Sequence, residues 1–327
     1  MKRQPSHIIS AETTWKVSAV KQVRTDLAME SLDGRDEKSL PGVRLSNWET
    51  GGVRVTEVNV STKEGAALLH KPIGHYITLE SEGVKQKIPQ ARQAMSNILG
   101  EELGRLLPKE RKGPVMVIGL GNRMVTPDAL GPLTVDHTLV TRHLFSELPD
   151  RVDDRMRSVC ALAPGVLGVT GIETMEMVRA VVQAVQPCAV VAVDSLSARA
   201  VSRVGCAVQL TDTGIQPGSG VGNRRMALSV ETLGVPVLAL GVPMVIYAAT
   251  IARDAFELLS GARGDEADGE ALDRMSDELL RGAMGEMIVT PREVDDLVHQ
   301  AALMLSGGVN RALHPDLSDL EIARMMS

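Results

Sequence analysis

The chain alternates between short, wholly apolar runs and longer segments in which apolar residues recur every three or four positions. Short runs rich in Val, Ile, Leu and Ala are typical of strands buried on both faces of a parallel sheet. Segments with helical periodicity are typical of helices that pack one face against such a sheet. The pattern predicts strands at 115–118, 158–163, 189–194, 205–210 and 236–241, and helices at 88–106, 133–145 and 171–186.

Residues 42–82 have a different pattern. Two stretches, 53–58 and 75–80, alternate apolar and polar residues and are separated by turns that contain Gly and Pro. A period of two predicts strands with one buried face. We therefore expect an α/β fold with a mostly parallel sheet, and a small β-rich subregion at 42–82 packed on it.

One stretch, residues 114–132 (PVMVIGLGNRMVTPDALGP), concentrates the candidate chemistry. The predicted strand ends at a glycine turn of residues 119–122, whose backbone N–H groups can face a ligand or a peptide chain. Asp128 follows just beyond the carboxyl end of the strand, where open α/β sheets gather their functional residues. Asp after Pro127 is also an ordinary turn residue, so both interpretations stay open.

A second carboxylate, Asp194, ends the apolar run at 189–194. If right-handed crossovers join the strands, Asp128 and Asp194 emerge at the same edge of the sheet. Two carboxylates brought close together cannot both ionise easily, so one can act as general base for water and the other as general acid for a leaving amine. The alternative is that Asp194 caps a helix that begins at Ser195.

Charge and composition limit the classes of function. The 327 residues carry a net charge of −6, which argues against a nucleic-acid binder, because such a protein needs a basic face. No run approaches the roughly 18 apolar residues of a membrane span, and the start lacks a secretory signal. Cys160, Cys188 and Cys206 lie in or beside apolar runs, as free thiols in a reducing compartment do. We expect a soluble, cytoplasmic protein.

Metal-ligand spacing is absent from the sequence. It contains no Cys-x-x-Cys and no His-Glu-x-x-His, and its seven histidines do not cluster with carboxylates. No Ser stands in a nucleophile elbow. We expect neither a metal nor a cofactor, which leaves carboxylate chemistry by elimination.

Longer motifs occur together in one order along nearly the whole chain. They are RTDLA at 24–28, GLGN at 119–122, VTPDALGP at 125–132, APGV at 163–166, GIET at 171–174, DTGI at 212–215, PGSGVGN at 217–223 and ETLGVP at 231–236, with a further match at 310–315. In this combination the chain resembles the germination proteases of spore-forming bacteria.

The resemblance implies an endopeptidase that begins the degradation of small acid-soluble spore proteins in the spore core during germination. It implies a three-layer α/β/α sandwich, similar to the hydrogenase maturation proteases, that assembles as a homotetramer. It also implies a zymogen that removes its own N-terminal propeptide. The two essential aspartates of the family match Asp128 and Asp194.

Cleavage in this family favours an acidic residue, then a large apolar residue, then Ala. We therefore predict self-cleavage between Asp26 and Leu27, with residues 1–26 as the propeptide and 27–327 as a single catalytic domain. Residues 260–285, acidic and rich in small side chains, are expected to form an exposed insertion. The expected substrate contacts are Gly119, Gly121, Asn122, Gly218, Ser219 and Gly220.

One position departs from the family pattern and leaves other functions open. Tyr247 stands where the family usually has Asp, which puts in question the activity of this chain or its pH dependence. One alternative is a maturation peptidase that trims a metalloenzyme precursor and senses nickel with its carboxylates. The other is an inactive relative that serves as a binding scaffold, in which Asp128 and Asp194 are only turn and cap residues.

Overall fold

The computed structural model describes residues 25–32, 40–109, 113–217, 226–263 and 287–326. Its strands are β1 (Val43–Thr50), β2 (Val53–Val60), β3 (Gly74–Glu80), β4 (Val115–Gly119), β5 (Val159–Leu162), β6 (Ala189–Ala198), β7 (Ala207–Thr211), β8 (Val237–Tyr247) and β9 (Ile288–Val289). Its α-helices are α1 (Lys63–Leu69), α2 (Glu82–Lys85), α3 (Pro89–Leu106), α4 (Leu130–Asp136), α5 (Arg142–Glu147), α6 (Leu167–Thr170), α7 (Thr174–Val185), α8 (Val230–Leu233), α9 (Ala248–Arg263), α11 (Val294–Leu313) and α12 (Asp319–Met325).

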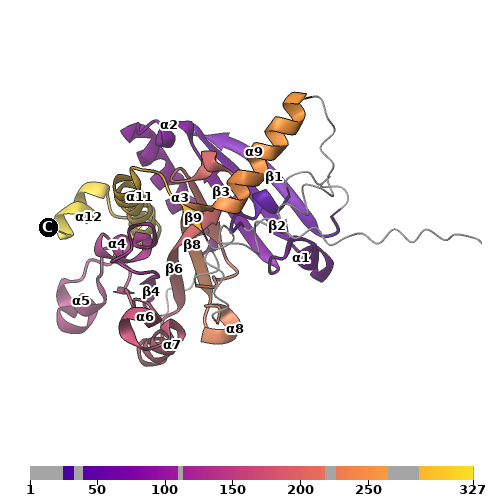
Figure 1. Cartoon of the computed structure of the whole chain (residues 1–327). Coiled ribbons are helices and arrows are strands. Elements are labelled where there is room, and N and C mark those ends of the chain that lie inside the picture. The colour runs from indigo at the N-terminus through magenta and orange to yellow at the C-terminus, as the bar shows by residue number, and fades with distance from the viewer. Residues whose placement is uncertain (1–24, 33–39, 110–112, 218–225, 264–286, 327) are drawn as a thin grey trace, which may run out of the picture.

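Within these residues all strands belong to one sheet, so the expected α/β fold class is confirmed (Figure 1). The strand order is β1-β2-β3-β7-β8-β6-β4-β5, and β9 pairs with β8. The central strands β8, β6, β4 and β5 run parallel, and antiparallel pairs extend the sheet on one side. The strands at 42–82 are continuous with this sheet, because β3 pairs directly with β7.

Two layers of helices enclose the central strands. Leu99 of α3, Leu130 of α4 and Leu305 of α11 pack on one face of the sheet. Met175 and Val178 of α7 pack on the other face. Figure 1 shows α3, α4 and α11 grouped together, away from α7 and α8. The result is the expected three-layer α/β/α sandwich.

The predicted helix at 133–145 is wrong, because two short helices, α4 and α5, occupy this region. The side chain of Asn310 on α11 binds the backbone between them. Its Oδ1 accepts a hydrogen bond from Leu139 N at 2.8 Å, and its Nδ2 donates to His137 O at 3.0 Å. In a continuous helix, these backbone groups would form hydrogen bonds within the helix. Because Asn310 satisfies them instead, the helix is interrupted between α4 and α5.

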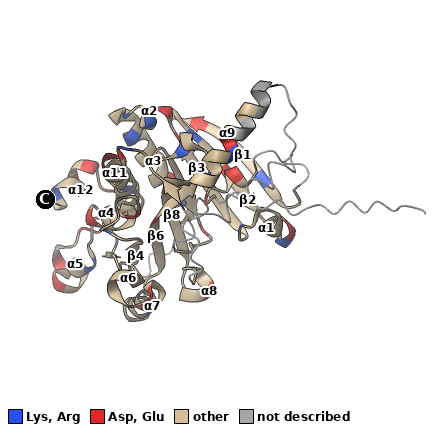
Figure 2. Cartoon of the chain, in the orientation of Figure 1, with Lys and Arg blue, Asp and Glu red and all other residues tan. Residues whose placement is uncertain are grey.

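Charged residues lie mostly at the periphery of the fold. Figure 2 shows acidic and basic residues interspersed on α1, α2 and α12. Among the residues of β4, β5, β6 and β8, only Asp194 is charged. A carboxylate in the centre of such a sheet carries a desolvation cost, which makes it a candidate for function. In the part of the chain that the structure describes, no helix is long and apolar enough to cross a bilayer.

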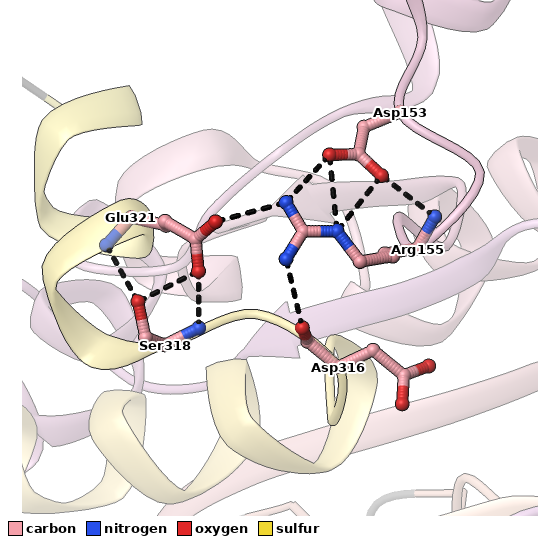
Figure 3. A network of polar contacts seen from close by, with 5 residues as sticks. All are labelled: Asp153, Arg155, Asp316, Ser318 and Glu321. Carbon is pink, nitrogen blue, oxygen red and sulfur yellow. Dashed lines mark hydrogen bonds and ion pairs between the residues drawn. The ribbon is translucent and has the colours of Figure 1, made fainter.

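A polar network fastens α12 to the segment before β5 (Figure 3). Glu321 accepts hydrogen bonds from Ser318 N at 2.8 Å and Ser318 Oγ at 2.6 Å, which closes a capping box. Arg155 Nη2 lies 2.8 Å from both Glu321 and Asp153, and Arg155 Nη1 donates to Asp316 O at 3.2 Å. The bonds from Ser318 and then from Arg155 lower the pKa of Glu321 from 4.5 to about 2.

Acidification should therefore loosen α12. A carboxyl group whose pKa is lowered by folding stabilises the fold above its ordinary pKa of 4.5, and the contribution is lost as the pH falls toward 2. Hydrogen exchange of α12 amides, corrected for intrinsic pH dependence, should rise across this interval. In Arg155→Ala it should already be faster above pH 4.5. Corrected exchange that does not change with pH would contradict the prediction.

Candidate active site

The glycine turn after β4 folds around Asp128, which lies in the short helix η3 (Thr126–Asp128). Asn122 N donates a hydrogen bond of 2.7 Å to Asp128 Oδ2. Gly121 has φ of +109°, and a Cβ at this position would lie 2.0 Å from Asp128 O. The turn therefore needs glycine for close approach. The contacts seen here are within the chain, so substrate binding by Gly119, Gly121 and Asn122 stays a prediction.

Asp194 lies within β6, not at its end. Residues 195–198 continue the strand and pair with β8, from Val242 to Ile246. The helix-cap interpretation of Asp194 is therefore wrong, because β8 extends beyond the predicted 236–241 and offers a partner for these residues. The Asp194 side chain is 5% exposed, and its Oδ1 accepts a hydrogen bond of 2.8 Å from Ser195 N.

Asp128 follows β4, and Asp194 lies on the neighbouring strand β6, one residue beyond the last residue that pairs with β4. The junction after Asp128 packs against the end of β4 and the middle of β6, since a Cβ at Gly131 would lie 2.2 Å from Leu120 O and 2.6 Å from Val193 O. Leu120 N also donates to Val193 O at 2.8 Å. Val193 immediately precedes Asp194. Asp128 and Asp194 therefore come from neighbouring parts of the fold, and their action as one acid–base pair stays a prediction.

Gly121→Ala should displace Asp128 and impair any activity that depends on it. The new methyl group would meet a backbone carbonyl, which cannot rotate away as a side chain does. A shift of Asp128 by about 1 Å is expected to slow turnover roughly 100-fold. Gly104→Ala is the matched control, because nothing lies within 4 Å of its Cβ position on α3. Equal self-cleavage rates for the two variants, followed by mass spectrometry, would disprove the steric role of Gly121.

The segment that contains the predicted cleavage bond is seated beside β6. Asp26 N donates to Ser197 O at 3.0 Å. Ser197 N and Oγ donate to Asp26 Oδ2 at 2.8 and 2.9 Å. Leu27 is fully buried and packs with Leu196, Ala198 and Ala207. Asp26 and Leu27 therefore contact β6 at positions two to four residues beyond Asp194.

Glu30 anchors the same segment from the other side. Its side chain is completely buried and accepts hydrogen bonds from Arg199 N at 2.7 Å and Ala200 N at 3.0 Å. Arg203 Nη1 lies 2.9 Å from Glu30, and Arg203 Nε lies 2.8 Å from Glu80. Burial tends to lower the pKa of Arg203, but its bonds to Glu80 and Glu30 raise it. The guanidinium therefore stays charged between the two carboxylates.

A cavity of about 290 Å³ lies between this segment and the central strands. It is bordered by residues of the segment, of β6, β7 and β8, and of the loop after β7, among them Asp26, Leu196, Gln209, Gly214, Ile215 and Gly241. Gly241 is the pairing partner of Asp194 in β8. The described part of the glycine-rich loop thus borders the cavity, whereas Gly218, Ser219 and Gly220 lie outside the described residues.

Tyr247 is buried near the end of β8, with 2% of its surface exposed, and pairs with Ile288 of β9. It stands six residues beyond Gly241. At roughly 3.3 Å per residue, this is about 20 Å along the strand. Tyr247 is therefore remote from Asp194 along β8, and its effect on that residue would have to be indirect.

Five residues at this site were not identified from the sequence: Glu30, Lys71, Ser197, Arg203 and Gln209. Lys71, Ser197 and Gln209 contact Asp26, and Arg203 contacts Glu30, across gaps of up to 183 residues along the chain. No local motif marks them. The one available signal was Glu30, a carboxylate inside the apolar stretch that follows the predicted cleavage bond.

The fold is an α/β/α sandwich in which Asp128 follows β4 and Asp194 lies on the adjacent parallel strand β6. The chain belongs to the germination protease family, whose model matches residues 19–271. The germination protease of Clostridium tetani (strain Massachusetts / E88) is 42% identical over 311 residues, covering 90% of this chain and 96% of the relative. That of Bacillus subtilis (strain 168) is 36% identical over 348 residues, covering 90% and 94%. The resemblance found in the sequence is thus confirmed.

Proposed function

We propose that the protein is an endopeptidase of spore germination that uses Asp128 and Asp194 as its general base and general acid. It is made as a zymogen and cleaves itself between Asp26 and Leu27, which frees residues 27–327 as the catalytic domain. Its substrates are small acid-soluble spore proteins in the spore core. It acts as a homotetramer and needs no metal or cofactor.

The observation that carries the proposal is the position of the Asp26–Leu27 bond. The segment Asp26-Leu27-Ala28 has the expected acidic, large apolar and small residues in order. Asp26 is bound to Ser197, three residues beyond Asp194 on β6. A sequence suited for cleavage therefore lies next to the cavity that Gly241, the partner of Asp194, also borders.

The chemistry follows from a pair that shares one proton. The ionised carboxylate takes a proton from water, and the water oxygen attacks the carbonyl carbon of Asp26. The protonated partner then gives its proton to the Leu27 nitrogen as the C–N bond breaks. The products are a new carboxylate at Asp26 and a new amine at Leu27. The two aspartates titrate as a coupled pair, so the roles belong to the pair.

Mass spectrometry of the purified full-length protein tests this proposal. After mild acidification we expect a loss of residues 1–26 and a new N-terminus at Leu27. An added small acid-soluble spore protein should then be cut after an acidic residue. A chain that stays whole under all conditions, and that leaves the added protein intact, would instead support the inactive-scaffold alternative. Cleavage restricted to a metalloenzyme precursor would support the maturation-peptidase alternative.

A further inference from the structure

The carbonyl oxygen of Asp26 is held by two side-chain donors. Lys71 Nζ donates to Asp26 O at 2.9 Å, and Gln209 Nε2 donates to the same oxygen at 2.8 Å. This oxygen belongs to the peptide bond between Asp26 and Leu27. Both are ordinary hydrogen-bond distances to the carbonyl of the intact bond, so both donors already point at the oxygen that becomes negative when the carbonyl carbon is attacked.

Gln209 also holds the other side of the bond. Its Oε1 accepts a hydrogen bond of 2.7 Å from Ala28 N. Gln209 lies in the centre of β7, between β3 and β8, and is 6% exposed. One side chain on a rigid strand therefore fixes both the carbonyl of Asp26 and the amide that follows Leu27. The peptide plane between these anchors has little freedom to rotate.

Lys71 is the cationic member of the pair. It follows α1 and also reaches Thr25 O at 3.5 Å. Burial lowers its pKa, while the nearby carboxylates Asp26 and Glu30 favour its charged form. An ammonium group in a site of low dielectric stabilises a negative oxygen more strongly than it would in water.

The cavity provides an approach to the carbonyl carbon. It is bordered by Asp26, Lys71 and Gln209 on one side and by Leu196 and Gly241 on the other. Side chains alternate along a strand, so Asp194 and Leu196 point to the same face of β6. The cavity that borders Asp26 therefore lies on the face of β6 toward which Asp194 points, although neither Asp128 nor Asp194 is among the residues that line it.

We propose that Lys71 and Gln209 form the oxyanion-stabilising pair for self-cleavage of the Asp26–Leu27 bond. This inference rests on the proposed function. As the water oxygen bonds to the Asp26 carbon, the carbonyl π electrons move to Asp26 O, and the two donors stabilise the resulting charge. The water proton passes to the aspartate pair, and the same pair returns a proton to the Leu27 nitrogen when the C–N bond breaks. No oxidant, reductant or further reactant is needed.

The first test compares rates of loss of residues 1–26 by mass spectrometry. Lys71→Met and Gln209→Leu keep much of the side-chain volume but remove the donors, and each should slow self-cleavage roughly 100- to 1,000-fold. Lys87→Met is the matched control, because Lys87 pairs with Asp296 at the surface. Its rate should equal that of the wild type.

The second test asks whether Lys71 and Gln209 act on the cleavage reaction itself or only hold residues 25–32 in place. Labelling with ¹³C-carbonyl Asp and ¹⁵N Leu gives amide–carbonyl NMR signals only from Asp-Leu pairs, which occur at 26–27, 296–297, 316–317 and 319–320. The measurement uses full-length chains that carry Asp194→Asn and therefore stay uncut. In this background, adding Lys71→Met or Gln209→Leu should move the Asp26 carbonyl signal upfield. The Leu27 amide signal should stay sharp at a folded position. The other three pairs serve as internal references.

The outcomes distinguish this inference from the proposed function. A wild-type chain that never loses residues 1–26 overturns the proposed self-processing and this inference with it. A wild type that cuts, while Lys71→Met and Gln209→Leu cut equally fast, overturns this inference alone. Slower cutting with a Leu27 signal at the position of a disordered chain also overturns it, because the donors then only seat the segment. Slower cutting with the segment still seated supports it.

Discussion

Asp128→Asn and Asp194→Asn should each leave the chain folded and uncut. The amide oxygen of Asn can still accept the bond that Asn122 N donates at position 128, and the bond that Ser195 N donates at position 194. The amide cannot take up and return a proton as a carboxyl group does. Self-cleavage should therefore fall at least ~1,000-fold in both variants.

Time-resolved mass spectrometry measures this loss, with thermal unfolding as the control for the fold. A matched control is Asp316→Asn, since Arg155 binds the backbone oxygen of Asp316 far from the cavity. If either Asp128→Asn or Asp194→Asn cuts at the wild-type rate, the shared-pair mechanism is wrong and that residue is structural. The same result for both would favour the scaffold alternative.

Glu30→Leu should cause a large loss of stability. Removing the carboxylate leaves the N–H groups of Arg199 and Ala200 without their acceptor and leaves Arg203 with Glu80 alone. Removing one partner of a buried ion pair lowers the free energy of unfolding by about 3–5 kcal/mol. For a chain of this length, we expect a fall in Tm of roughly 5 °C.

Differential scanning calorimetry checks this expectation in the full-length, uncut protein. Glu30→Gln keeps hydrogen-bonding capacity and should cost only ~1–3 kcal/mol. Glu101→Leu, at an exposed position on α3, should stay within about 0.5 kcal/mol of the wild type. A Glu30→Leu protein with unchanged Tm would mean that the contacts of Glu30 contribute nothing to stability.

The sheet and its functional edge are predictable from the sequence because both depend on local patterns. An unbroken apolar run indicates a buried strand, and parallel strands must present their carboxyl ends together. These rules predict that Asp128 and Asp194 emerge near one another, and the resemblance to the germination proteases selects them as the essential pair. The end of β6 is not predictable in this way, because residues 195–198 are strand only through their pairing with β8.

The contacts around Asp26 depend on tertiary structure alone. Lys71 follows α1, Gln209 lies on β7 and Ser197 lies on β6. The sequence around each of them resembles that of an ordinary surface or strand position. Glu30 follows the N-terminal arm, where a charged side chain is ordinarily solvated. Glu30 is buried because it binds the N–H groups of Arg199 and Ala200 and the guanidinium of Arg203. No spacing along the sequence predicts these contacts.

Because residues 25–32 are held in place by several contacts, cutting of the Asp26–Leu27 bond and release of the N-terminal segment are separate events. Asp26 is anchored on Ser197, while Leu27 and Glu30 are anchored by packing and by Arg203. Hydrolysis of the bond between them removes none of these anchors, so the two new ends remain neighbours at high effective concentration. If self-cleavage occurs as proposed, Asp26 would leave the lining of the cavity only when the N-terminal product dissociates. A chain that appears fully cut on a denaturing gel can still be closed in its native state.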